Sequence, residues 1–321
     1  MRAFKSIIYS FLLGGLLAFI SQGFSTIWNT VLPGTPLEFF IGGATLVSMG
    51  VIGFTLAGFA IYQRFEEWAT FGALLPFSGF SMAVGMKILT PWTKGESLGK
   101  CLWGGAWLCI WFNIVGCVTC IGFGYLCTVL GADPVLPAKN TSLMVFPAAF
   151  LMGGLICVFF QICFLIVKAI TPKAKPLWIL LLGWMMGPLC APIGLSGTLA
   201  NVFGQGFSIM IPIGGYNMYN VGVSLAAGDM GGALVHYGAF LLAVVGLFLC
   251  GLFTFIIYNA KFGRTPIHAV HVMQAQRSID GLVNQMLPSD NLEGLDYDID
   301  PEIVEALKRA EHSQTFSEKR V

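Results

Sequence analysis

The stretch 10-SFLLGGLLAFISQ-22 decides the architecture of this chain, because a second copy, 149-AFLMGGLICVFFQ-161, follows 139 positions later. The matching residues are Phe11, Leu12, Gly14, Gly15, Leu16 and Gln22 in the first copy and Phe150, Leu151, Gly153, Gly154, Leu155 and Gln161 in the second. An internal duplication in an apolar chain is typical of channels and transporters that are built from two related halves. We therefore expect two structural repeats.

Each copy is followed by a shorter, glycine-rich motif, 74-LLPFSGFSM-82 in the first half and 210-MIPIGGYNM-218 in the second. Pro76, Gly79, Phe80 and Met82 align with Pro212, Gly215, Tyr216 and Met218. Proline removes a backbone donor and glycine permits tight turns, so both residues interrupt a helix. The pair of motifs predicts one interrupted segment in each half.

The composition is that of a membrane protein. Apolar residues make up 56% of the chain and charged residues 10%, and the mean hydropathy is +0.79; soluble domains carry about 25% charged residues. Six apolar runs approach or exceed the ~20 residues that a membrane-spanning helix needs: 6–29, 38–61, 101–130, 143–167, 177–198 and 232–259. Because the first run is copied internally, we expect a retained span rather than a cleaved signal peptide.

Two further apolar stretches, 68–90 and 199–226, contain the glycine-rich motifs, and their path decides the topology. If both cross the bilayer and the N-terminus is inside, eleven Lys and Arg lie inside and six outside. If both enter and return on the same side, sixteen lie inside and one, Lys139, lies outside. Cytoplasmic loops are enriched in Lys and Arg, so the second arrangement is favoured.

Three true spans per half is an odd number, so the second half must be inverted relative to the first. The predicted fold is therefore an all-α integral membrane protein of two inverted repeats, each with three transmembrane helices and one re-entrant or broken Gly/Pro segment. Both termini are expected in the cytoplasm. The predicted parts are a first repeat at 1–130, a linker loop at 131–142, a second repeat at 143–260 and a tail at 261–321.

The tail differs from the rest of the chain, with seven basic and ten acidic residues. Apolar residues at helical spacing over 266–286 predict one short helix. Asp300 and Pro301 predict the start of a second, because they suit the N-cap and the first helical position. We expect a solvated cytoplasmic extension.

The interrupted segments are the predicted substrate path. Irregular backbone at membrane depth is tolerated only where it is buried in protein or lines a cavity, and paired interruptions mark the binding sites of repeat transporters. The predicted path residues are Pro76, Ser78, Gly79, Phe80, Pro212, Gly214, Gly215, Tyr216, Asn217 and Asn220. The alternative is a pair of kinked, packed helices with satisfied amides.

The duplicated apolar motif has a different predicted role. Small residues let membrane helices approach closely, so Gly14, Gly15, Gly153 and Gly154 are expected to pack helices. The matching glutamines, Gln22 and Gln161, either bond across helices or face a cavity, and the sequence leaves both options open.

Several function classes are not expected. No catalytic constellation is visible, so we predict no enzyme and no cofactor. The nine cysteines lie in or beside apolar runs, and 117-CVTC-120 has no partner pair, so no metal site is predicted. The acidic pair in 65-FEEW-68 either attracts Ca²⁺ or forms a solvated turn. No carboxylate is evident deep in a span, which favours passive conduction over ion-coupled pumping.

The motifs also resemble a known family. Residues 150–161 match the F-L-x-G-G-L-I-C-x-x-x-Q stretch of the SpoVA family of sporulation membrane proteins, AC and AE type, and 11–22 match it more loosely. Residues 76–80 and 212–216 resemble the family's x-P-x-x-G-F segment, with Tyr216 in place of Phe. The resemblance covers about 1–260, as two family units in one chain.

This resemblance implies a channel or facilitator of spore-forming bacteria that moves calcium–dipicolinic acid, or a similar small metabolite, across the inner membrane of the forespore or spore. The implied partners are the lipid bilayer, this cargo, and other sporulation membrane proteins or further copies of the chain; nucleic acid is not expected. The alternatives are an ion-coupled secondary transporter of a small solute and a non-conducting membrane scaffold.

Overall fold

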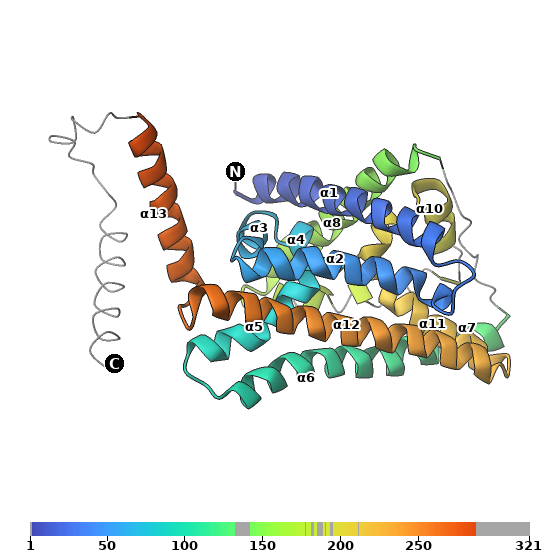
Figure 1. The fold of residues 1–321 in the computed structure, drawn as a ribbon. Helices are drawn as coiled ribbons and strands as arrows, with labels where there is room; N and C mark the ends of the chain where they lie inside the picture. Colours follow the sequence, from blue (N-terminus) through green and yellow to red (C-terminus); the bar gives the residue numbers. More distant parts are fainter. Residues whose placement is uncertain are drawn as a thin grey trace.

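The computed structural model describes residues 2–131, 142–176, 178–180, 183–184, 189, 191–192, 195–210 and 212–286. For residue 2 and for 195–196, 212–216 and 277–286 it describes the backbone only. All regular elements within these ranges are helical, and they contain no β-strand (Figure 1). Most of the predicted linker and the tail beyond Met286, including the helix predicted at Asp300, lie outside the described residues.

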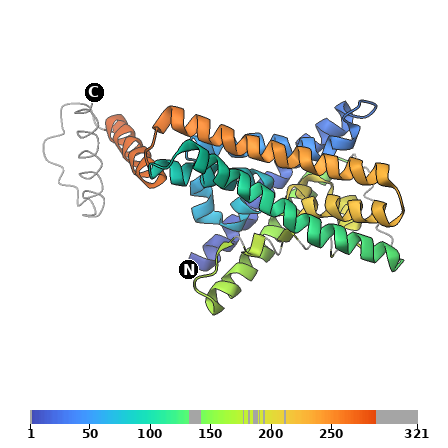
Figure 2. The ribbon, with the colours of Figure 1, turned by 90° about the horizontal axis from the view of Figure 1, so that it is seen from below.

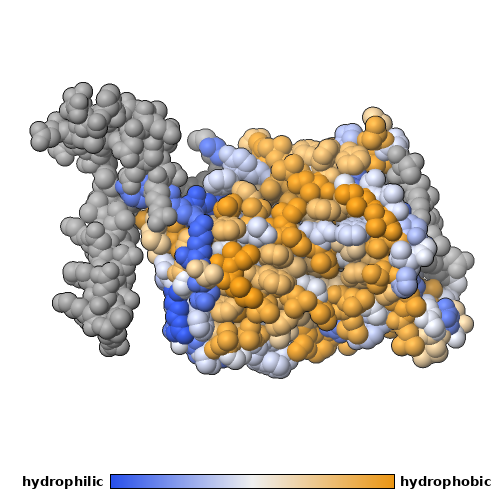
Figure 3. Space-filling model, viewed as in Figure 1, coloured by the Kyte–Doolittle hydropathy of each residue, from blue (hydrophilic) through white to orange (hydrophobic). Residues whose placement is uncertain are grey.

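Five helical segments are long and apolar enough to cross a membrane: Ala3–Val31, Glu38–Gly58, Leu98–Val129, Val145–Ile170 and Met230–Phe262. They confirm five of the six predicted spans; ten of the 22 residues of the sixth, 177–198, lie outside the described residues. The segments consist of α1 (Arg2–Val31), η1 (Glu38–Phe40) with α2 (Ile41–Gly58), α6 (Leu98–Gly116) with the π-turn η2 (Cys117–Ile121) and α7 (Gly122–Val129), α8 (Val145–Ile170) and α12 (Met230–Phe262). Figure 3 shows apolar residues over most of the visible face of the helix bundle and a hydrophilic band at one end. The protein is a multi-pass membrane protein.

The two copies of the duplicated motif pack against each other, because α1 and α8 run antiparallel. Ser10 lies beside Gln161, with 3.2 Å between the hydroxyl and the side-chain carbonyl oxygen. Further along, the rings of Phe19 and Phe146 are 5.3 Å apart. Rising residue numbers on α1 thus meet falling numbers on α8.

The glycine pairs lie at this crossing. A β-carbon on Gly14 would overlap the sulfur of Cys157, and one on Gly153 would overlap the methyl group of Ala18. On Gly15 and Gly154 it would come within 2.7 Å and 2.8 Å of backbone oxygens of the opposite helix. All four glycines therefore occupy positions where the two backbones approach too closely for a larger residue.

The last long helix, α12, runs parallel to α2 and to α5 (Phe77–Thr93). The α2 contacts join Gly50 to Cys250 and, two turns on, Gly58 to Ile257. Trp92, at the end of α5, donates a 2.9 Å hydrogen bond to the side-chain amide oxygen of Asn259. Glycine at the contact positions lets the apolar helices lie close together.

In contrast, α5 and α6 form an antiparallel hairpin. The rings of Phe80 and Phe112 lie 4.4 Å apart near its open end, and Gly104 approaches Lys87 near the turn. Helix α12 is parallel to α5 and therefore antiparallel to α6. Helices α6 and α12 lie side by side (Figure 2).

Both interrupted segments have the same order of elements. The first is α3 (Tyr62–Ala69), α4 (Phe71–Leu74), an extended residue at Pro76, and α5; the second is α10 (Leu195–Phe203), η3 (Gly206–Ile209), an extended residue at Met210, and α11 (Pro212–Ala226). The first break falls at the predicted proline. The second falls just before Pro212, which instead begins α11, a position that suits proline because its missing N–H is not needed there.

The short helix α13 (Ile267–Met286) folds back at one end of the molecule, as the apolar spacing predicted. The Arg64 guanidinium donates to the His271 carbonyl oxygen at 3.1 Å, and the His271 ring lies 3.5 Å from the Glu67 carboxylate. Arg264 stacks over the Trp92 ring at 3.9 Å. We call the end of the molecule that carries Arg64, Arg264 and His271 the basic end. The opposite end, which carries the turns at 32–37 and 227–229, is the distal end.

Candidate substrate passage

The two interruptions meet. Pro76 and Met210 form an isolated antiparallel backbone bridge, and both have extended conformations, with φ/ψ of −65°/153° and −64°/140°. Met210 lies two residues before Pro212, the repeat counterpart of Pro76. The bridge joins the broken segment of one half of the chain to that of the other, in the interior of the helix bundle.

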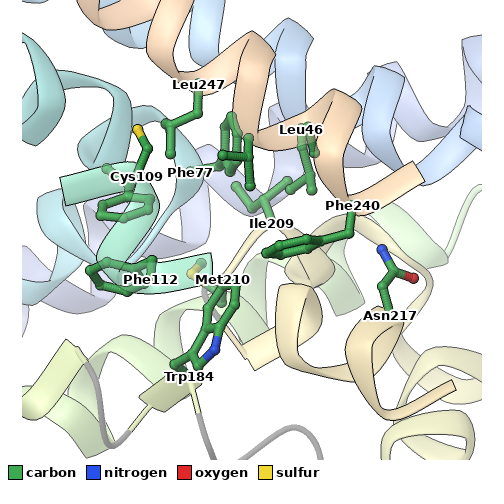
Figure 4. A pocket seen from close by; sticks show the side chains of 13 residues that line it. Leu46, Phe77, Cys109, Phe112, Trp184, Ile209, Met210, Asn217, Phe240 and Leu247 are labelled. Atoms are coloured by element: carbon green, nitrogen blue, oxygen red, sulfur yellow. The ribbon is translucent and has the colours of Figure 1, made fainter. Parts of the chain in front are cut away.

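A cavity of about 40 Å³ lies beside the bridge (Figure 4). It is lined by Leu46, Phe77, Phe80, Cys109, Phe112, Trp184, Ile209, Met210, Asn217, Phe240, Ala243, Val244 and Leu247. One water occupies about 30 Å³ of liquid, and drug-sized ligands need about 300–1,000 Å³. In this conformation the cavity has room for water and no room for a larger solute.

Aromatic rings form a continuous wall of the cavity. Phe112 lies 5.6 Å from Trp184, and Trp184 lies 5.8 Å from Phe240, measured between ring centroids. The lining side chains that the structure describes include one amide, Asn217, and no acidic or basic group. The Trp184 indole N–H is buried and has no hydrogen-bond partner among the residues that the structure describes. The wall therefore offers flat apolar surface and very few polar contacts.

The predicted path residues of the first segment lie at and behind the break. The Tyr62 hydroxyl lies 2.7 Å from the Ser78 hydroxyl and donates to the Ala73 carbonyl oxygen at 3.0 Å. A β-carbon on Gly79 would overlap that same carbonyl oxygen. Of the residues predicted in this segment, Phe80 reaches the cavity wall, whereas Ser78 and Gly79 hold the backbone next to it.

The predicted residues of the second segment lie along α11. Pro212, Gly214, Gly215 and Tyr216 form its first turns, and their side chains lie outside the described part of the structure. Asn217 lines the cavity, and Figure 4 shows its amide beside Phe240. Asn220 is half-buried further along α11 and is not among the lining residues.

The two glutamines at matching positions of the duplicated motif, Gln22 and Gln161, both bond across helices. The side-chain oxygen (Oε1) of Gln161 accepts from the Phe71 backbone N–H at 3.2 Å. The side-chain oxygen (Oε1) of Gln22 accepts from the Gly206 backbone N–H at 2.7 Å. Neither glutamine lines the cavity. Each contacts the interrupted segment of the other half of the chain.

Sequence reasoning missed most of the cavity wall. Phe112, Trp184 and Phe240 are apolar residues within apolar runs, and nothing local separates a ring that faces a cavity from one that faces lipid. The wall also depends on segments far apart in the chain, from Leu46 to Leu247. No group of three His, Cys, Asp or Glu residues suited to a metal ion occurs in the described ranges.

The comparisons with known proteins give a family match within the first predicted repeat. Residues 6–129, from α1 to α7, match the sequence profile of the SpoVAC/SpoVAEB sporulation membrane protein family. No curated protein and no solved structure matches the chain.

Proposed function

We propose that this chain, which over residues 6–129 belongs to the SpoVAC/SpoVAEB sporulation membrane protein family, is a channel or facilitator for a small solute. The observation that carries the proposal is the contact of the two interruptions at Pro76 and Met210, beside an aromatic cavity. Binding sites of repeat transporters lie where discontinuous helices from the two halves meet. Calcium–dipicolinate, in the forespore or spore inner membrane, is the cargo that we propose.

The proposal includes an inverted arrangement of the two repeats. It is supported by three pairs of matching helices that run in opposite directions: α1 and α8, α5 and α11, and α6 and α12. In this arrangement α5 leads from the break to the basic end and α11 leads from the break to the distal end. Because positive charge favours the cytoplasmic side, we assign the basic end and both termini to the cytoplasm.

The cavity chemistry suits a flat solute whose charge is screened. Aromatic side chains stack on flat rings, and a wall without charged groups disfavours free ions. Calcium cancels the charge of the dipicolinate dianion, and the N-terminal ends of α5 and α11, which both begin at the break, suit its carboxylate oxygens. Since the cavity is about 40 Å³, conduction requires the segments around the bridge to move apart.

The test is flux of calcium–dipicolinate from proteoliposomes, followed by terbium luminescence of the released dipicolinate. Ala243→Phe fills the cavity and should reduce flux at least tenfold. Val245→Phe is the matched control, because this side chain lies on the same helix and is 54% exposed on its outer surface. Phe240→Ala enlarges the cavity and should increase flux, so the proposal does not depend on one variant folding.

The outcomes separate the rival functions. Equal flux in Ala243→Phe and Val245→Phe, with both variants folded, would remove the cavity from the path. Flux that requires a proton or sodium gradient would identify an ion-coupled transporter. A folded protein that passes no calcium–dipicolinate, with or without membrane tension, would favour the scaffold alternative.

A further inference from the structure

We infer that Gln161 and Gln22 are reciprocal clamps, each of which holds the interrupted segment of the other repeat, and that releasing them opens the cavity toward opposite faces of the membrane. The inference rests on the proposed function, since it assigns the closing of the proposed passage to two named side chains. The two glutamines are the terminal residues of the duplicated motif.

The first clamp is a buried network on the side of the basic end. Gln161 is 2% exposed. Its carbonyl oxygen accepts from the Phe71 N–H and the Ser10 hydroxyl, each at 3.2 Å, and its amide donates to the Ser6 hydroxyl at 3.2 Å. Ser10 in turn contacts the carbonyl oxygen of Ala69. Helix α8 thereby fixes the turn between α3 and α4 against the first part of α1.

The second clamp uses the same residue type on the side of the distal end. Gln22 is 4% exposed, and its carbonyl oxygen accepts from the Gly206 N–H, the first backbone donor of η3. One turn further along α1, the Ser25 hydroxyl and the Asn29 amide donate to the Gln205 carbonyl oxygen at 3.1 Å and 3.3 Å. Helix α1 thereby fixes the turn between α10 and η3.

Both clamped turns contain a residue with positive φ. Thr70, directly before the donor Phe71, has φ of 35°, and Gly204, two residues before the donor Gly206, has φ of 72°. The clamped pieces, α4 and η3, are short and each ends at the bridge between Pro76 and Met210. A short piece between a turn and a backbone bridge can move as a unit when the bond that ties it to the other half of the chain is lost.

The clamps act on opposite sides of the bridge. Gln161 bonds to Ser6 and Ser10, in the first turns of α1, whereas the Gln22 network continues to Asn29, at the far end of the same helix. Loss of Gln161 should therefore admit reagents from the basic end, and loss of Gln22 should admit them from the distal end. General loosening of the fold would admit reagents from both ends alike.

Cys109 is the natural reporter, because it lines the cavity and is 5% exposed. In a full-length variant with Cys109 as its only cysteine, reconstituted in proteoliposomes, a membrane-impermeant maleimide is applied to each face in turn. Gln161→Met should increase the labelling rate from the basic end at least about tenfold, because each lost buried bond shifts the equilibrium by roughly that factor. Gln22→Met should do the same from the distal end.

Two controls keep the test specific. Gln63→Met replaces a buried glutamine whose hydrogen bonds, within the described part of the chain, are to the Ala57 carbonyl oxygen and the Met86 sulfur, both in the first half. It should leave Cys109 protected. In Gln161→Glu, unlike Gln161→Met, Cys109 should be protected from labelling at acid pH, because the protonated carboxyl group keeps both an acceptor and a donor.

Labelling that is equal from both faces, or unchanged in both clamp variants, would overturn the inference. One-sided labelling in a protein that passes no calcium–dipicolinate would leave the clamps in place and remove the proposed function. Flux of calcium–dipicolinate through the parent protein, with labelling of Cys109 unchanged in the clamp variants, would keep the proposed function and remove the clamps.

Discussion

The first and second interruptions hold the same backbone shape with different side chains. The first rests on Gln161, on the serines of α1, and on the Tyr62 hydroxyl behind the break. The second rests on Gln22 and, through Gln205, on Ser25 and Asn29. A glutamine carbonyl that accepts from the first N–H of the clamped piece is the element that both share.

The difference indicates which features the repeat must keep. The bonded backbone donor, the glutamine and the following break recur, whereas the side chains that support them differ. The first interruption has the more buried and more extensive network, since Ser10, Tyr62 and Ser78 are fully buried, whereas Asn29 is only half-buried. We therefore expect the first interruption to be the more rigid of the two.

The largest expected effect is at the first break. Gly79→Ala would place a methyl group on the Ala73 carbonyl oxygen, which is backbone and cannot turn aside. We expect a loss of stability of about 3 kcal/mol, measured by thermal unfolding in detergent. Gly238→Ala is the matched control, because a β-carbon there meets nothing within 4 Å, and alanine is favoured in helices. Equal unfolding temperatures would show that the first break is not tightly packed.

The next effect compares the two glutamines directly. Gln161→Met removes bonds to three partners, and Gln22→Met removes the bond to Gly206 and a weak 3.4 Å contact to Thr26. We expect losses of about 2–3 and about 1–2 kcal/mol, since a buried donor left unpaired costs about 1–3 kcal/mol. Chemical unfolding of both variants measures the difference. A larger loss for Gln22→Met would reverse the predicted order of rigidity.

A smaller effect is expected at the residue that only the first interruption has. Tyr62→Phe leaves the Ser78 hydroxyl and the Ala73 carbonyl oxygen without their phenol partner, at a cost of about 1 kcal/mol. Tyr258→Phe, which loses a 2.7 Å bond to Thr265, should cost about as much. Only Tyr62→Phe should increase the labelling of Cys109. Increased labelling in both variants would mean that the phenol has no specific role at the break.

The smallest effect concerns the helix before the first break. Burial, with a further contribution from Glu67, raises the pKa of the Glu66 carboxyl. The folded state therefore holds this proton at pH values where the unfolded chain has released it, and stability falls as the pH rises through that window. Glu66→Gln should raise the unfolding temperature by about 1 °C at neutral pH and not at all at acid pH. A gain that persists at acid pH would point to packing rather than to charge.

Much of the fold could be predicted from local patterns. Long apolar runs predict spans because a bilayer demands about 20 residues, and proline with glycine predicts the interruptions. The bridge partner of Pro76 could not be predicted, since Met210 precedes the motif that carries the second proline. The aromatic wall escaped for a different reason: Phe112 and Phe240 differ from lipid-facing phenylalanines only in their tertiary contacts.

The most direct test of the central claim uses the residues that follow the two half-helices, Lys94 after α5 and Ala227 after α11. Both are exposed. Lys94→Cys and Ala227→Cys, each as the only cysteine, are treated in sealed membrane vesicles with a maleimide that cannot cross the bilayer. If two inverted halves meet at Pro76 and Met210, the two thiols react from opposite faces, with Lys94→Cys on the same face as a cysteine at the basic end. Reaction of both thiols from one face would contradict the account.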